Sequence, residues 1–498
     1  LYPSALDRRW SPGRQQAAGR ARLGEHSSST WGAATMSETH LRQGRQTVKL
    51  GLIKVVHDLF PEESLKTSYS ILEGVFCNLD GSVLSTREVR LIEARLNDWV
   101  ATGEPVTLLR KDGGYYHYQV GDLVVRAVYP AHTDPSQVEP FSLIPFSYGF
   151  IVDFGDIEKG NSHPLIPPTR LSAAYEANQI WLDRVGVETV ADVNAAIDAG
   201  RALRLVSIAE ALHEKQLADI ADSILRQRRA LRVLLISGPT SSGKTSTAQR
   251  LATQLEVNGL RPVALSLDNY FLNREQTPRD ADGRFDFETL DALDLPLLTA
   301  QITGLVEGQT VGTPVFDFVQ GRRLEQSVSV RVGAGEILLI EGLHALNPRL
   351  LEDVNRNLAF RVYVSALGGL NIDLMNRVPT TEIRLLRRIV RDHKYRGIAP
   401  EVTIGQWASV RRGEYLNVFR FQEDADVMFN SSMIYELNAI RPFAEAALAT
   451  IPDDSAHVDT RDRLLNLLSF FKPVDVARIP FNSILREFIG GSIYFDPA

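Results

Sequence analysis

One stretch constrains this chain more than any other: Gly238-Pro239-Thr240-Ser241-Ser242-Gly243-Lys244-Thr245. It fits the pattern G-x-x-x-x-G-K-[ST] of a phosphate-binding loop (P-loop), whose glycines let backbone N–H groups wrap a phosphate. The run Val233 to Ile236 before it is apolar and β-branched, and Ser246 to Val257 after it has apolar residues at helical spacing. A buried strand before the loop and a helix after it are the context that the motif requires. We therefore predict a phosphate site here, against the alternative of a chance match in a glycine loop.

The residue types in this loop suit phosphate chemistry. The N-terminus of the following helix adds positive potential to the loop amides. Lys244 can reach the terminal phosphates of a nucleotide, and the Thr245 hydroxyl can bind Mg²⁺. The predicted phosphate-binding set is the whole loop together with Ser246.

Composition limits the remaining possibilities. A chain of 498 residues, 44% hydrophobic and 23% charged, is typical of a soluble globular protein with two to four domains. The net charge of −7 argues against a nucleic-acid partner, and no apolar run is long enough to span a membrane. The single cysteine, Cys77, excludes an internal disulfide and a cysteine-cluster zinc site. The presence of a single cysteine fits a reducing compartment, so we expect a cytoplasmic protein.

The N-terminal third divides into two parts. Residues 1–35 are rich in arginine and serine, and we favour a disordered extension over a transit peptide. Residues 36–175 show a mixed α+β pattern. We expect a helix from Leu50 to Leu59 and a helix that starts at a capping box of Ser85 and Glu88. Strands are expected at Tyr115–Val120, Leu123–Tyr129 and Pro145–Phe154.

This α+β part resembles the second additional domain of threonyl-tRNA synthetases. The segments that carry the resemblance are Leu59-Phe60-Pro61-Glu62, Glu73-Gly74-Val75-Phe76 and Leu84 to Ile92, with Glu88 and Glu93. The paired histidines of such editing domains are absent, because His57 has no partner at i+4. The resemblance therefore implies a binding or structural role for this part.

Residues 176–230 read as a helical region that links two domains. Ser207 and Glu210 fit a second capping box, and an apolar stripe follows them. His213-Glu214-Lys215 is interpreted as a solvated face of this helix.

Residues 231–450 alternate strands and helices, which predicts a parallel sheet with helices on both faces. Four further strands are expected to end at Asp268, Glu341, Ser365 and Asn430. Ligands of such sheets bind beyond the carboxyl ends of the strands, where Asp268 and Glu341 fall beside the P-loop. The alternative for each carboxylate is a helix cap or a salt bridge.

Six ordered segments of this region resemble the uridine kinase and phosphoribulokinase family, especially its long bacterial forms with a synthetase-like N-terminal domain. Besides the P-loop they are Ser266 to Phe271, Arg284 to Glu288, Thr313 to Phe318, Ile340 to Gly342, Arg387 to Gly397 and Ala425 to Val427. The resemblance implies an α/β P-loop kinase sheet preceded by a smaller α+β domain, with ATP and Mg²⁺ as cofactors.

The same resemblance implies roles for individual residues. Asp268 matches the general base, and Thr245 and Glu341 match the magnesium site. Lys244 and Arg391 join Asp268 as expected catalytic residues, while Arg388 and Arg396 are expected on the nucleotide phosphates. The expected acceptor-binding residues are Asp286, Phe316 and Asp317.

One departure concerns the acceptor. Uridine–cytidine kinases carry a tyrosine and a histidine where this chain has Phe316 and Gly321. Loss of hydrogen-bonding groups can change discrimination strongly. The predicted acceptor is a small hydroxyl compound, most simply a nucleoside, with a sugar or polyol as the alternative. A rival from another class is a nucleotide-dependent regulator linked to RNA.

The tail, residues 451–498, is expected to dock on a domain or on a second subunit, so a homo-oligomer remains open.

Overall fold

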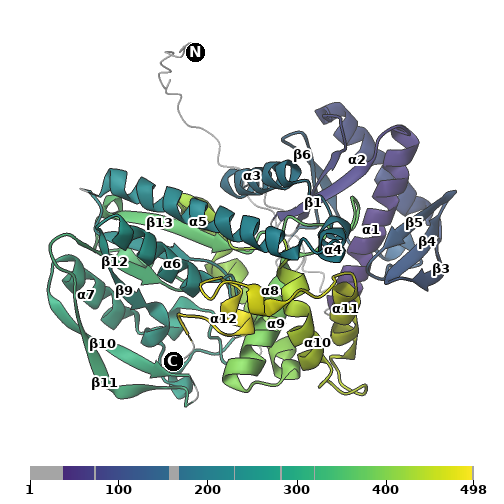
Figure 1. The fold of residues 1–498 in the computed structure, drawn as a ribbon. Helices are drawn as coiled ribbons and strands as arrows, with labels where there is room; N and C mark the ends of the chain where they lie inside the picture. The colour runs from purple at the N-terminus through teal and green to yellow at the C-terminus, as the bar shows by residue number, and fades with distance from the viewer. Residues whose placement is uncertain are drawn as a thin grey trace, which may run out of the picture.

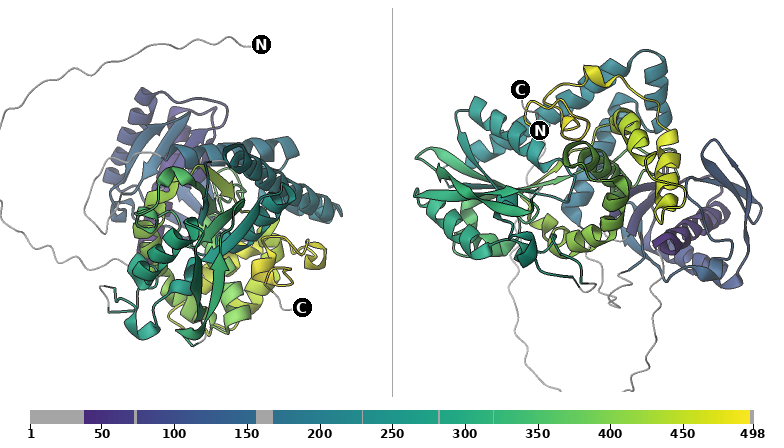
Figure 2. Two further views of the ribbon diagram at one scale, coloured as in Figure 1. Left: turned by 90° about the vertical axis from the view of Figure 1, so that its left-hand side faces the viewer. Right: turned by 90° about the horizontal axis from the view of Figure 1, so that it is seen from below.

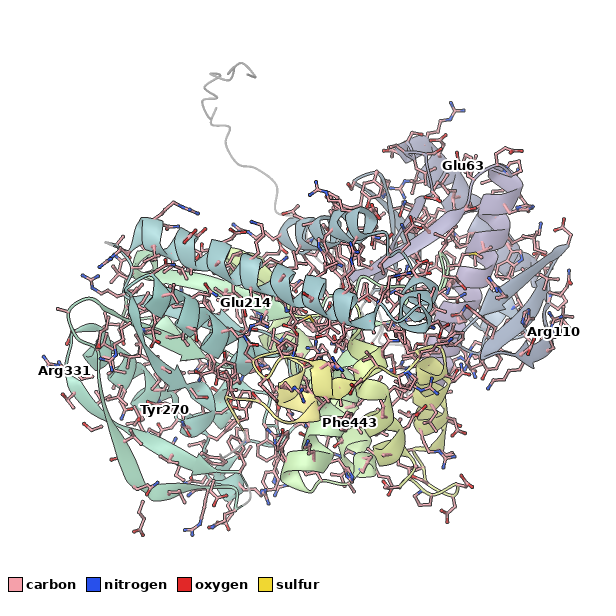
Figure 3. All side chains as sticks on the ribbon, in the orientation of Figure 1. Glu63, Arg110, Glu214, Tyr270, Arg331 and Phe443 are labelled. Carbon is pink, nitrogen blue, oxygen red and sulfur yellow. The ribbon has the colours of Figure 1, made fainter. Side chains whose placement is uncertain are left out.

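The computed structural model describes residues 38–495 apart from 72–73, 156–167, 229, 281–282 and 319. The extension expected at residues 1–35 therefore lies outside the described residues. The chain has an α+β part at one end and an open parallel sheet at the other, with long helices between them (Figure 1). Seen from below, the two parts stand on opposite sides of a helical middle (Figure 2). Arg110 and Arg331 lie at the two ends of the molecule (Figure 3).

The N-terminal part combines helices with two antiparallel sheets, as the mixed pattern predicted. Its helices and strands are α1 (Glu38–Leu59), β1 (Leu65–Ile71), β2 (Gly74–Leu79), α2 (Thr86–Thr102), β3 (Val106–Asp112), β4 (Tyr115–Val120), β5 (Leu123–Ala127), β6 (Ser142–Phe146) and β7 (Gly149–Asp153). The strand orders are β1-β2-β7-β6 and β3-β4-β5. The capping box of Ser85 and Glu88 forms, which confirms that prediction, whereas the helix expected from Leu50 already begins at Glu38.

Three helices follow: α3 (Thr169–Val185), α4 (Val190–Asp198) and α5 (Ala202–Gln227). The capping box predicted at Ser207 and Glu210 is wrong, because both residues lie inside α5, and Glu210 is buried and accepts a hydrogen bond from the Tyr435 hydroxyl (2.8 Å). The solvated face predicted at His213 is also wrong: this side chain is only 2% exposed, with Nε2 3.2 Å from the Ser432 carbonyl oxygen. The first error arises because α5 already begins at Ala202, and the second because α5 turns the His213 side of the helix inward.

The parallel sheet has five strands in the order β14-β13-β8-β12-β9. They are β8 (Val233–Ser237), β9 (Arg261–Ser266), β12 (Glu336–Glu341), β13 (Ala359–Ser365) and β14 (Val427–Asn430), which confirms the five predicted strands. The connecting elements are α6 (Lys244–Val257), α7 (Leu295–Val306), the hairpin β10 (Thr310–Asp317) and β11 (Arg322–Arg331), α8 (Thr380–Arg396), α9 (Pro400–Asn417) and α10 (Glu436–Leu448).

Helices cover both faces of this sheet, as predicted. Leu234 and Ile236 of β8 belong to a core with side chains of α5 and α6. The alternate residues Val233 and Leu235 belong to a second core with α7. Because successive side chains of a strand point to opposite faces, this partition shows that the sheet is buried on both sides.

The C-terminal tail docks on its own chain. It contains α11 (Val458–Ser469) and the short α12 (Arg486–Ile489). Ile484 and Phe488 are fully buried in the core that α5 and α6 form with the sheet. The view from below shows the tail, in yellow, beside α5 and near the helical middle (Figure 2). Among the described residues, no helix has both the length and the apolar character needed to cross a bilayer.

Candidate active site

The P-loop joins β8 to α6 at the carboxyl edge of the sheet. β8 is the central strand, with β13 on one side and β12 on the other. Ser241 and Gly243 adopt positive φ values of 57° and 82°, a left-handed conformation that turns the chain tightly. Gly238 is required for a different reason, since a Cβ atom there would lie 1.9 Å from the Val364 carbonyl oxygen.

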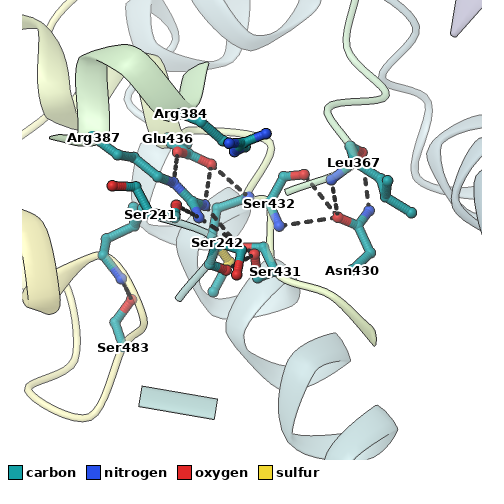
Figure 4. A network of polar contacts seen from close by, with 12 residues as sticks. Ser241, Ser242, Leu367, Arg384, Arg387, Asn430, Ser431, Ser432, Glu436 and Ser483 are labelled. Carbon is teal, nitrogen blue, oxygen red and sulfur yellow. Dashed lines mark hydrogen bonds and ion pairs between the residues drawn. The ribbon is translucent and has the colours of Figure 1, made fainter. Parts of the chain in front are cut away.

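Two arginines of α8 bind backbone carbonyl groups of the loop, and Figure 4 shows Arg387 beside Ser241. The Arg384 Nε donates to the Thr240 carbonyl oxygen (3.0 Å), and Arg387 Nη1 donates to the Ser241 carbonyl oxygen (3.3 Å). These carbonyl groups are thus satisfied by cations outside the loop. We infer that this arrangement reserves the inner side of the loop for backbone N–H groups, which bind anions.

Each of these arginines is buried and paired with a glutamate. Arg384 forms an ion pair with Glu414, and Arg387 forms one with Glu436. Glu414 also accepts the Thr240 N–H (2.7 Å), so one carboxylate binds both an arginine and the loop. A buried charge requires such a partner, because desolvation of an unpaired ion costs several kcal/mol. Sequence analysis missed both pairs, whose members are 30 and 49 residues apart.

The loop contains polar atoms that lack a partner within the described residues. The Ser241 and Ser242 hydroxyls are buried without a hydrogen bond. Lys244 Nζ donates to the Pro239 carbonyl oxygen at the start of the loop (3.1 Å). Two unsatisfied hydroxyls and an ammonium group at a helix N-terminus suit a nucleotide's phosphates.

Glu341 ends β12 beside the loop and is only 9% exposed. The Ser266 hydroxyl donates to Glu341 Oε1 (2.6 Å), and the Thr245 hydroxyl lies 3.4 Å from Oε2. Burial and the nearby Asp268 carboxylate raise the pKa of Glu341 to about 7. A carboxylate and a hydroxyl are ligands that Mg²⁺ accepts together with phosphate and water, so this pair fits the predicted metal site.

Asp268 follows β9 in a short 3₁₀ helix, Leu267–Tyr270. β9 pairs with β12 so that Ser266 lies opposite Glu341, which brings Asp268 to the same edge of the sheet. Its charge acts on Glu341 and on Arg396. The structure thus brings together the predicted base, the predicted metal ligands and the P-loop.

The predicted acceptor-binding residues lie in the neighbouring loops. Phe316 and Phe318 of the hairpin form a ring cluster with Phe271, with centroids 5.2 to 6.4 Å apart. Asp286 accepts the Glu288 N–H (3.0 Å), and Asp317 accepts the Gln320 N–H (2.9 Å). Each carboxylate therefore has a local backbone partner, and their roles toward an acceptor stay predictions.

Gly321 closes the turn of the same hairpin with a φ of 66°. A side chain here would begin 2.9 Å from Nε of Arg274. A histidine at this position would therefore displace the Arg274 side chain. This agrees with the presence of Gly321 where uridine–cytidine kinases carry a histidine.

The three arginines expected on the phosphates (the lid arginines Arg388, Arg391 and Arg396) surround one carboxylate, Asp392. Their nitrogens lie 3.2, 3.0 and 3.2 Å from its oxygens. Burial opposes ionisation of Asp392, but the arginines hold its pKa below the ordinary value. Arg396 also lies 5.7 Å from the ring centre of Phe318. Three cations on one anion leave positive charge that phosphate oxygens can use.

Glu288 ends the segment Arg284 to Glu288 that carries the family resemblance, but sequence analysis assigned it no role of its own. It is half-buried, and burial raises its pKa to about 7, an effect opposed by Arg388 and Lys244. Gly413 of α9 makes room for it, because a Cβ on that glycine would lie 2.1 Å from the Glu288 Cβ.

Comparison with known proteins gives a family for this region. Residues 233–436 match the model of the Phosphoribulokinase / Uridine kinase family. A uridine kinase of Deinococcus deserti is 28% identical over 185 residues, which are 37% of this chain and 80% of that protein. A uridine kinase of Saccharomyces cerevisiae is 32% identical over 177 residues, which are 35% of this chain and 32% of that protein. The structure of a D-glycerate 3-kinase from Cryptococcus neoformans has 19% identity and a TM-score of 0.29, and the match covers 41% of this chain and 87% of that one.

Proposed function

We propose that residues 233–436, a domain of the phosphoribulokinase / uridine kinase family, transfer the γ-phosphoryl group of ATP to a hydroxyl group of a small acceptor, with Mg²⁺ as the metal. The observation that carries this proposal is the convergence of three features at one sheet edge. The P-loop leaves β8, Asp268 follows β9 and Glu341 ends β12. Phosphoryl transfer needs positioning, charge neutralisation and a proton acceptor, and these groups supply all three.

Each group of residues in this site has its own role in phosphoryl transfer. The loop amides, Lys244 and the lid arginines bind the phosphates and neutralise their charge. Asp268 takes the proton from the acceptor hydroxyl as its oxygen forms a bond to the γ-phosphorus and the bond to the β-phosphate oxygen breaks. Thr245 and Glu341 would hold Mg²⁺, which supplies charge neutralisation on the phosphates. The products are ADP and the phosphorylated acceptor.

A nucleoside is the first candidate for the acceptor. The ring cluster of Phe271, Phe316 and Phe318 provides aromatic faces on which a base can stack. The relatives named uridine kinase support the same class. A sugar or polyol is the second candidate, because Phe316 and Gly321 offer no side-chain hydrogen bond to a pyrimidine.

The test is a screen of hydroxyl acceptors for ADP release by the full chain. Nucleosides, sugars and polyols are each supplied with ATP and Mg²⁺, and Lys244→Ala serves as the inactive control. We expect ADP release to depend on one acceptor class and to vanish in the control. ATP binding without acceptor-dependent ADP release in any class would favour a nucleotide-dependent regulator instead. The cytoplasmic location, the domain boundaries and a homo-oligomer stay predictions.

A further inference from the structure

The C-terminal tail places a carboxylate on the first turn of α6. Glu487 Oε2 lies 2.6 Å from the Ser246 hydroxyl oxygen and 3.4 Å from the Ser246 backbone nitrogen. With Gly243 as the N-cap, Ser246 is the third residue of α6, and it is fully buried. The tail therefore covers the helix end on which the P-loop depends.

This position is one at which a nucleotide phosphate would bind. The N–H groups of a first helical turn have no partner within their own helix, and P-loops use them for phosphate oxygens. A carboxylate and a phosphate are both acceptors and both anions. They compete for the Ser246 N–H and repel one another at contact distance.

The backbone that carries Glu487 is firmly held. A Cβ on Gly243 would lie 2.6 Å from the Ile484 Cγ2, so the tail packs directly against the loop. Lys394 Nζ donates to the Ile489 carbonyl oxygen (2.6 Å). Asn482 Nδ2 donates to Oε1 of Glu214 on α5 (3.1 Å), a residue labelled in Figure 3. These contacts favour movement of the Glu487 side chain alone over release of the tail.

We propose that Glu487 is a built-in competitor of the nucleotide: its carboxylate occupies the Ser246 anion position in the free protein and turns away when phosphates enter. The inference rests on the proposed nucleotide site. It assigns the C-terminal tail an autoinhibitory contact that sets the affinity for nucleotides. Because the competition concerns an anion, it acts on ligands that carry phosphates and not on adenosine.

Calorimetry on the full chain tests this inference with ADP, pyrophosphate and adenosine as probes. Glu487→Ala should tighten ADP and pyrophosphate binding about tenfold, the scale of one charge-assisted hydrogen bond lost from the free state, and leave adenosine unchanged. Glu487→Gln removes the charge and keeps the shape, so it should shift affinity in the same direction. The matched control is Glu256→Ala, which removes the same charge from the exposed far end of α6 and should leave ADP affinity within about twofold.

The outcomes separate the two proposals. If wild type binds ADP and both Glu487 variants bind it equally well or more weakly, Glu487 does not compete with the nucleotide, although the nucleotide site is still supported. If neither wild type nor variants bind ADP or pyrophosphate, the proposed nucleotide site is wrong, and the proposed competition by Glu487 is contradicted as well. Should Glu487→Ala fail to fold, the affinity of Glu487→Gln decides, because an unchanged value contradicts the competition.

Discussion

Arg384 and Arg387 of α8 differ from the lid arginines of the same helix, Arg388, Arg391 and Arg396. Arg384 and Arg387 are almost fully buried and form ion pairs with Glu414 and Glu436. The lid arginines are 11%, 16% and 40% exposed and share Asp392. Arg384 and Arg387 also donate to the P-loop backbone. The lid arginines outnumber the one carboxylate that they share.

This difference separates two roles that residue type alone does not distinguish. A buried arginine–glutamate pair that is bonded to the loop fixes the geometry of the loop. A partly exposed cluster with surplus positive charge can rearrange around phosphates. Substitutions in the two groups should therefore affect different quantities, stability for Arg384 and Arg387 and turnover for the lid arginines.

The largest effect is expected for the buried arginines of α8. Arg387→Ala leaves Glu436 as an unpaired buried charge and removes the bond to the Ser241 carbonyl oxygen. We expect the free energy of unfolding to fall by about 3–5 kcal/mol, as measured by chemical denaturation. The double variant Arg387→Met with Glu436→Gln removes both charges and should recover most of this loss. A single variant as stable as wild type would contradict the structural role of Arg387.

The lid arginines should show the opposite pattern. Arg391→Ala removes a cation expected on the phosphates, and we expect kcat to fall about 10²-fold, as for the loss of one electrostatic donor in other active sites. The melting temperature should stay near the wild-type value, because Arg388 and Arg396 still balance Asp392. Steady-state kinetics and thermal unfolding on the same preparation check both halves. A large stability loss with normal kcat would reverse the assignment.

A smaller effect is expected at the buried side chain of His213. Burial, with the charge of Arg250, lowers the pKa of His213 to about 3. The folded state therefore holds this ring neutral, while the unfolded chain binds a proton below its ordinary pKa of about 6.5. Stability is unaffected above that pH and falls as the pH drops from about 6.5 toward 3, by at most about 1.4 kcal/mol per unit.

His213→Gln removes this titration, so the difference in unfolding free energy between variant and wild type should change between pH 7 and pH 5.5. Denaturation at both pH values measures it. A difference that stays constant over this range would show that His213 is not held neutral.

The P-loop and the sheet edge could be predicted from the sequence because their signals are local. The loop pattern, the apolar strands, Asp268 just after β9 and Glu341 at the end of β12 all lie within short segments, and parallel topology brings those strand ends together. The buried pairs of α8 could not be predicted, since nothing near Arg384 indicates that Glu414 lies beside it. The contact of Glu487 with Ser246 spans 241 residues and has no local signal. At Ser207 and Glu210 a local signal was present but misleading. The two residues match a capping box, whereas α5 begins five residues earlier at Ala202.

The central claim is phosphoryl transfer with Asp268 as the base, and one paired measurement on Asp268→Asn tests it most directly. The variant keeps the shape of the side chain and removes the proton acceptor. Turnover with the acceptor found in the screen should fall by about 10²–10⁴, while calorimetry should show ATP–Mg²⁺ affinity close to wild type, because Lys244 and the loop amides still bind the phosphates. Turnover within about threefold of wild type would contradict the account, since loss of a general base has a far larger effect.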